Sequence, residues 1–233
     1  MIDPSLRLRR AIHANDPLLV SRICKSHPPY LLQNPDFSPL GLSNTSLHLA
    51  CSLGHLAVVR TLLALGHERD GVSLNEEHQT PLMIASAAGH TEIVHLLCKE
   101  FPDNIARRDS RGRDAIMEAS RGGHDTCLQI LLTFAPGGPA ALLNNADIDG
   151  NTALHFASSY GHLLVLRTLL AAGADSEKRN AWSWTPVSYS ATVQAEVYFK
   201  GLVAEVEKRR TMRKEAEIKG TGAGVRLVSG EEA

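Results

Sequence analysis

The apolar positions of this chain fall in short paired runs. In GNTALHFASSYGHLLVLRTLLAAGAD, which spans residues 150–175, one run begins after Thr152 and stops at Gly161, and a leucine-rich run stops at Gly173. Thr is a favoured residue at the N-cap of a helix, and Gly is favoured where a helix ends in left-handed backbone. The pattern therefore predicts two short helices separated by a Gly-His turn, with their apolar faces packed together.

The same pair of runs recurs along the chain. Its first positions are Thr45, Thr80, Asp114, Thr152 and Thr185, which are 35, 34, 38 and 33 residues apart. A Gly-His pair follows nine and ten residues after each of the first four: Gly54-His55, Gly89-His90, Gly123-His124 and Gly161-His162. A period near ~33 residues with a T-P-L-H-x-A core is typical of ankyrin repeats. Over roughly residues 5–210 the chain resembles the ankyrin family, which implies an all-α solenoid of helix-turn-helix units with hairpin-like loops.

The repeat frame divides the chain into seven segments. We expect an N-terminal capping repeat at 1–34, a long loop with the first full repeat at 35–79, and the second repeat at 80–113. The third repeat, with a loop insertion, follows at 114–151 and the fourth at 152–184. A C-terminal capping repeat with a charged helix occupies 185–218, and 219–233 is expected to be a disordered tail. The four prolines between residues 27 and 44 argue against regular helix there.

The recurring residues have structural roles in this frame. The predicted structural positions are Thr45, His48, Gly54, His55, Thr80, Gly89, His90, Gly123, His124, Thr152, His155, Gly161, His162, Thr185 and Pro186. The resemblance implies that His48 and His155 hydrogen-bond to the neighbouring repeat. The Gly-His histidines should lie in a row, about ~10 Å apart, which is too far for shared coordination of zinc at ~2.0 Å. We therefore expect no metal and no cofactor.

Both ends depart from the pattern, as terminal repeats with a polar outer face do. At the N-terminal end the expected inward positions are Leu6, Leu8, Ile12, Leu18, Leu19 and Ile23. At the C-terminal end they are Val193, Val197, Leu202, Val203 and Val206. Asn15 stands where the other repeats have glycine, and Asn tolerates left-handed backbone. Glu118 stands where the other repeats have apolar residues, so its carboxylate needs solvent or a nearby arginine.

Composition narrows the class of protein. The formal net charge is −1, which argues against nucleic acid or a membrane surface as the main partner. The four cysteines form no C-x-x-C pair and suit a reducing compartment as buried thiols. No apolar signal segment begins the chain and no run approaches ~18 apolar residues. We expect a cytoplasmic protein that does not insert into the membrane.

No catalytic motif stands outside the repeats: G-x-S-x-G, H-E-x-x-H and phosphate-binding glycine loops are lacking. We expect a non-enzymatic scaffold that offers a concave face to a protein partner and takes no small-molecule substrate. The predicted contact residues lie at hairpin tips and just before each Gly-His pair. They are Glu76, Glu77, Gln79, Ser110, Arg111, Arg113, Arg121, Asp149, Asn151, Tyr160, Trp182 and Trp184. Arg, Trp and Tyr often anchor interfaces, but the two tryptophans could instead only cover the open edge of the last repeat.

Several non-consensus stretches carry a narrower resemblance. PSLRLRRAI, LALGHERD, HLLCKEFP, WSWTP and VYFKGLVAEVEKRR are similar to the family of ankyrin-repeat subunits of fungal target-of-rapamycin complex two. This resemblance implies a peripheral subunit that docks on large scaffold subunits of a kinase complex and reaches the plasma membrane through that complex. The alternative is an ankyrin adaptor of another system, such as a nuclear regulator or a ubiquitin-ligase substrate receptor.

Overall fold

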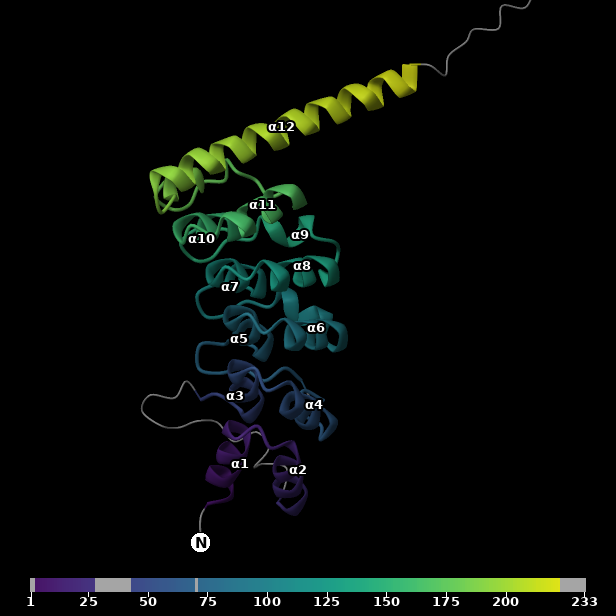
Figure 1. Ribbon diagram of the computed structural model, residues 1–233, viewed down its shortest axis with the longest axis vertical. Coiled ribbons are helices and arrows are strands. Elements are labelled where there is room, and N and C mark those ends of the chain that lie inside the picture. The colour runs from purple at the N-terminus through teal and green to yellow at the C-terminus, as the bar shows by residue number, and fades with distance from the viewer. Residues whose placement is uncertain (1–2, 28–42, 70, 223–233) are drawn as a thin grey trace, which may run out of the picture.

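The chain forms an elongated stack of helix pairs, as the computed structural model shows for residues 3–27, 43–69 and 71–222 (Figure 1). The α-helices are α1 Pro4–His13, α2 Pro17–Ser26, α3 Ser46–Leu53, α4 Leu56–Ala64, α5 Pro81–Ala88, α6 Thr91–Glu100, α7 Ala115–Gly122, α8 Asp125–Phe134, α9 Ala140–Leu143, α10 Ala153–Ser159, α11 Leu163–Ala172 and α12 Val193–Gly222. Two 3₁₀ helices complete the set, η2 Pro102–Ala106 and η3 Val187–Tyr189. The described residues include no strand, so the predicted all-α solenoid is confirmed.

The first helices of three full repeats begin as the sequence predicts. The side chains of Thr45, Thr80 and Asp114 accept hydrogen bonds from the backbone N–H three residues later, at 3.4, 3.2 and 2.9 Å. These bonds satisfy amide groups that have no partner within the helix. The first helix of a repeat packs on the first helices of its neighbours, α3 on α5, α5 on α7 and α7 on α10.

The T-x-L-H histidines join adjacent repeats, as the family resemblance implied. The Nε2 atom of His48 lies 2.9 Å from the carbonyl oxygen of Gln79, and that of His155 lies 3.0 Å from the carbonyl oxygen of Trp184. Both imidazoles are almost completely buried. Each ring also bonds to the Thr at the N-cap of its own helix through Nδ1. These histidines therefore tie a helix start to the next hairpin.

The Gly-His pairs interlock one repeat with the next. The Nε2 atoms of His90, His124 and His162 each lie 3.0 Å from a carbonyl oxygen near the end of the preceding first helix. A Cβ atom added to Gly54, Gly89 or Gly123 would lie only 2.5–2.6 Å from the ring of the following histidine. These glycines also have φ of 76–79°, in the left-handed region. Glycine is thus required twice, for backbone conformation and for close approach of the imidazole.

We expect His155→Ala to lower the free energy of unfolding by about 1–3 kcal/mol, because it leaves buried polar groups without partners. His78→Ala should change that free energy by less than about 0.5 kcal/mol, since His78 is exposed at a hairpin tip. Urea denaturation followed by circular dichroism measures both values. Equal midpoints for the two variants would contradict the assigned role of His155.

The terminal repeats bury partly different residues from those expected. Leu8, Ile12 and Ile23 are buried at the N-terminal end, whereas Leu6 and Leu18 are exposed, so the prediction for these two leucines is wrong. Asn15 has a φ of 51°, which confirms its left-handed backbone.

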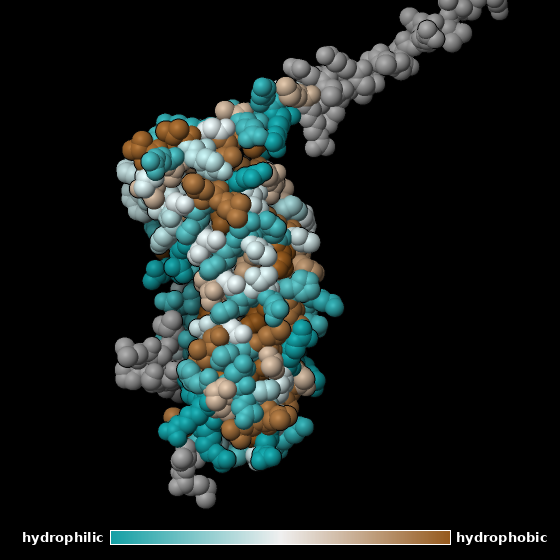
Figure 2. All heavy atoms as spheres, in the orientation of Figure 1, coloured by the Kyte–Doolittle hydropathy of each residue, from teal (hydrophilic) through white to brown (hydrophobic). Residues whose placement is uncertain are grey.

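In α12 the prediction for Val193 and Val197 is also wrong. The buried positions there are Ala195 and Phe199, and Leu202, Val203 and Val206 pack beside them. These five residues form one stripe at helical spacing, and Val193 lies about 200° away from Ala195 around the helix. Figure 2 shows apolar atoms gathered near the start of α12. Val193 and Val197 in α12 and Leu163 and Leu164 at the start of α11 are exposed.

The last repeat keeps only a trace of its first helix. Only η3 follows Thr185, whose hydroxyl lies 3.1 Å from that of Ser188. The residues added to the third repeat include the short helix α9, with Leu142 and Leu143 buried. Helix α12 continues to Gly222, and the disorder expected from residue 219 stays a prediction. The expectations for 28–42 and 223–233 lie outside the described residues.

Within the described ranges, no helix combines the length and the apolar character needed to cross a membrane.

Candidate protein-interaction surface

Four hairpin tips, residues 75–79, 109–113, 147–151 and 180–184, share one construction. The first residue of each tip is Asn75, Asp109, Asp147 or Asn180, and its Oδ1 accepts the backbone N–H groups two and four residues later at 2.7–3.0 Å. Such Asx turns fix a tight backbone loop. These four residues are not among the predicted positions, although each stands five positions before the first residue of the next repeat.

Backbone hydrogen bonds join the tips into a continuous edge. The N–H groups of Ser110, Ile148 and Ala181 donate to carbonyl oxygens of the preceding tip, those of Glu77, Arg111 and Asp149, at 2.8, 3.0 and 2.8 Å. Each tip therefore lies against its neighbours like paired strands. The predicted contact residues at the tips therefore lie side by side on one edge.

The predicted contact residues differ in accessibility. Glu76, Ser110, Arg111, Asp149, Tyr160, Trp182 and Trp184 are exposed, whereas Glu77, Gln79, Arg113 and Arg121 are half-buried. Asn151 is buried, so its predicted place on the partner face is not supported by its accessibility. Its Oδ1 accepts from Asn180 Nδ2 at 3.0 Å, and its Nδ2 donates to Asp147 Oδ2 at 3.3 Å. Asn151 thus links two tips.

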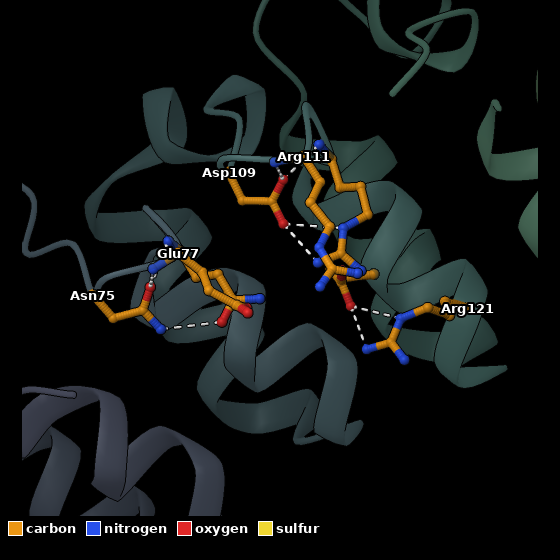
Figure 3. Close-up of polar contacts among 8 residues, drawn as sticks. Asn75, Glu77, Asp109, Arg111 and Arg121 are labelled. Carbon is orange, nitrogen blue, oxygen red and sulfur yellow. Dashed lines mark hydrogen bonds and ion pairs between the residues drawn. The ribbon is translucent and has the colours of Figure 1, made fainter. Parts of the chain in front are cut away.

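Arg113 belongs to a buried ionic network with Asp109, Glu118 and Arg121, and Figure 3 labels Asp109 and Arg121. The guanidinium of Arg113 lies 2.8 Å from a carboxylate oxygen of Asp109 and 2.9 Å from one of Glu118, while Arg121 lies 2.7 Å from the other oxygen of Glu118. The side chain of Arg113 is only 12% exposed and that of Glu118 only 1%. The expectation that Glu118 reaches an arginine is confirmed, whereas Arg113, a predicted contact residue, is largely withdrawn from the surface.

Arg121 connects this network to the solvent-accessible surface, because its side chain is 38% exposed. Burial alone would lower the pKa of its guanidinium, but hydrogen bonding and charge from Glu118, with a smaller effect of Tyr160, raise that pKa overall. The ring of Tyr160 stacks on the imidazole of His162, with centroids 6.0 Å apart and planes 8° from parallel. Arg121 and Tyr160 therefore form a fixed, partly accessible pair below the tips.

The two tryptophans of the last tip have different surroundings. The ring of Trp184 meets Tyr189 edge to face at 5.4 Å, and its carbonyl accepts from His155. Part of Trp184 thus covers η3, in agreement with the alternative that it protects the open end. In the part of the chain that the structure describes, no such ring contact is found for Trp182, whose side chain remains 55% exposed. Both backbone N–H groups bond to Asn180, so the exposed ring stands on a fixed turn.

The described residues hold no group of three or more His, Cys, Asp or Glu side chains that could bind a metal ion. The polar groups that are close together form caps, turns and ion pairs within the repeats. The accessible ones instead form the edge of tips and the Arg121–Tyr160 pair, an arrangement suited to contact with another macromolecule.

Comparison with known proteins agrees with this architecture. The family model "Ankyrin repeats (3 copies)" matches residues 8–109 and 99–180. The Saccharomyces cerevisiae protein "Target of rapamycin complex 2 subunit AVO2" is 31% identical over 210 residues, covering 89% of this chain and 47% of that protein. The Arabidopsis thaliana "E3 ubiquitin-protein ligase XBAT33" is 39% identical over 109 residues, covering 46% of this chain and 20% of the ligase. The chain thus spans about half the length of the yeast relative and less of the plant one.

Among solved structures, the ankyrin repeat protein EF0377 superposes with a TM-score of 0.69 at 20% sequence identity, covering 88% of this chain and 98% of that one. This likeness shows the fold. Ankyrin repeats are protein-interaction modules without catalytic machinery of their own. The family match, the relatives and the fold agree that this chain belongs to the ankyrin-repeat family.

Proposed function

We propose that this chain is a non-enzymatic scaffold and a peripheral subunit of a target-of-rapamycin complex two assembly, docked on larger scaffold subunits. The observation that carries the proposal is the extent of the similarity to the yeast subunit. It covers 89% of the chain and so continues beyond the repeat region 8–180, where consensus residues no longer account for it. The similarity to the plant ubiquitin ligase covers only 46%. In this role the protein would be cytoplasmic and reach the plasma membrane through the complex.

Affinity purification of the tagged chain from its native cell, followed by mass spectrometry, tests this proposal. The expected result is recovery of the target-of-rapamycin kinase with other subunits of complex two. Recovery of ubiquitin-ligase components or nuclear factors in place of the kinase would instead support an adaptor of another system.

We propose the exposed part of the tips, with Arg121 and Tyr160 beneath them, as the docking surface. Interfaces are enriched in Trp, Tyr and Arg, and a few such residues usually provide most of the binding energy. Of these residue types, Arg111 and Trp182 are exposed at two different tips. Arg113 is excluded from this surface, because its guanidinium is neutralised by two carboxylates inside the protein.

The double variant Arg111→Glu with Trp182→Ala is expected to reduce capture of the kinase complex by about thirtyfold or more. Loss of one aromatic hot spot costs about 2 kcal/mol, and reversal of one charge adds repulsion. Quantitative pull-down with equal amounts of folded protein measures the effect, and Glu92→Lys on the exposed side of α6 is the matched control. Normal capture by a folded double variant would place the interface elsewhere.

A further inference from the structure

We infer that the tips accept an extended partner segment that carries a basic residue, an acidic residue and two apolar residues, each about three positions apart. The inference rests on the proposed function only in taking the partner to be a protein. It assigns the chemistry and the order of the partner's side chains, which the ankyrin fold by itself leaves open.

The spacing follows from the bonds between the tips. Each tip is a hairpin with two strand-like sides, and it bonds to the next tip through its backbone, as Glu77 does to Ser110 and Arg111 does to Ile148. Paired strands lie about 4.8 Å apart, so successive tips are offset by about 10 Å. An extended chain advances about 3.3 Å per residue, so a segment crossing the tips moves about three residues per tip.

The chemistry changes from tip to tip. Tip 75–79 presents Glu76, an exposed residue whose carboxylate accepts a hydrogen bond from Ser43, beside the half-buried Glu77. Tip 109–113 presents Arg111, because Arg113 is paired internally with Asp109 and Glu118. A partner segment therefore meets negative charge at one step and positive charge at the next, which favours a basic residue followed by an acidic one.

The next two tips favour apolar side chains. Ile148 is 72% exposed on tip 147–151, and Trp182 is more than half exposed on tip 180–184. Asp149 is exposed beside Ile148, so an acidic partner residue is repelled at this step and fits only beside Arg111. The preferred segment is therefore basic, acidic, apolar and apolar at positions 1, 4, 7 and 10, spaced by about three residues.

The rigidity of the tips strengthens this selection. Every tip is held by an Asx turn, and Arg113 is additionally fixed between Asp109 and Glu118. Binding then requires little ordering of the receptor, so more of the contact energy contributes to affinity. A flat folded surface would not place single side chains at the spacing of the tips. Such a surface is the alternative partner, and the experiment distinguishes it from an extended segment.

Synthetic peptides test the order of charges. One fluorescein-labelled peptide of ten residues carries Lys, Asp, Leu and Phe at positions 1, 4, 7 and 10 with Ser at the others, and its counterpart exchanges Lys and Asp. Each is made in both chain directions, and fluorescence anisotropy measures binding to the full chain. The first peptide should bind about fivefold more tightly than its counterpart in one direction, since the two exposed charge pairs together are worth about 1 kcal/mol.

A charge-swapped protein provides the matched control. In the variant Glu76→Lys with Glu77→Lys and Arg111→Glu, the preference between the two peptides should reverse. Three outcomes would each overturn the inference: equal binding of the two peptides, a preference that the charge swap leaves unchanged, and no binding of either peptide. The last two outcomes would favour a folded partner surface. Recovery of the kinase complex is a separate result: peptide selectivity without kinase recovery would refute the proposed complex while leaving this inference intact.

Discussion

Replacing Arg113 with Glu is expected to lower the free energy of unfolding by about 3–5 kcal/mol, because it breaks a buried ion pair, removes the counter-charge of Asp109 and leaves Glu118 paired with Arg121 alone. The new carboxylate would stand among those of Asp109 and Glu118, both of which are buried. Asp109 also holds the turn of its tip through the N–H groups of Arg111 and Arg113. Repulsion there would disturb the tip as well as helix α7.

Urea denaturation followed by circular dichroism measures this loss, and Arg111→Glu is the matched control two residues away. Arg111 is exposed, so its change should stay within about 0.5 kcal/mol. An Arg113→Glu protein as stable as the control would show that the network contributes nothing to the fold. The same reasoning removes Arg113 from any test of partner binding, since loss of capture by that variant would report unfolding.

Acidification from pH 7 to pH 4 is expected to remove about 3 kcal/mol of the stability that depends on His48. Burial lowers the pKa of this imidazole from 6.5 to about 4, despite its bond to the carbonyl of Gln79. When the pH lies between these two pKa values, His48 binds a proton in the unfolded chain and stays neutral in the folded chain. Stability therefore falls as pH decreases through this window, by about 1.36 kcal/mol for each unit of pKa difference.

His67 should behave in the same direction, because burial lowers its pKa to about 4 as well. Burial raises the pKa of Glu68 and of Asp114, so these two carboxyl groups take up protons more readily in the folded state and oppose the histidines. The measurement must therefore isolate one residue at a time.

The difference in unfolding free energy between wild type and His48→Gln, taken at several pH values from 7 to 4, isolates the contribution of His48. That difference should shrink by about 3 kcal/mol on acidification. For the exposed His78, the corresponding difference with His78→Gln is the control. A difference that stays constant across the window for His48 would show that its imidazole is protonated equally well in the folded state.

Much of the fold could be predicted because the same residues begin and end the helices in each repeat. Thr45 and Thr80 cap helices, Gly54 and Gly89 end them, and each does so through short-range geometry that any copy of the motif repeats. The ends could not be predicted as well. Helix α12 has aliphatic residues on two faces, and only packing against α11 decides that Phe199 is buried and Val197 is not.

The candidate surface shows the same limit. Sequence position placed Arg111 and Arg113 together at a hairpin tip, but only the folded structure brings Arg113 to Glu118 and leaves Arg111 exposed. In the sequence, this pairing is indicated by Glu118, an acidic residue at a position that is apolar in the other repeats. Trp182 and Trp184 were likewise equivalent in sequence, and the contact with Tyr189 separates them.

The glycine–histidine interlock has a consequence for how many repeats the array contains. Gly161 is followed by no such histidine: the nearest atom to a Cβ added there is that of Ala191, at 3.7 Å. Thr192 then stands where a histidine would, and its hydroxyl caps α12 through the N–H of Ala195. A whole repeat inserted before Gly161 would bring its own glycine and histidine and preserve every nearest-neighbour coupling. One added after α12 would find only η3 in place of a first helix and no Gly-His pair to continue the coupling, so the array does not extend by simple duplication at this end.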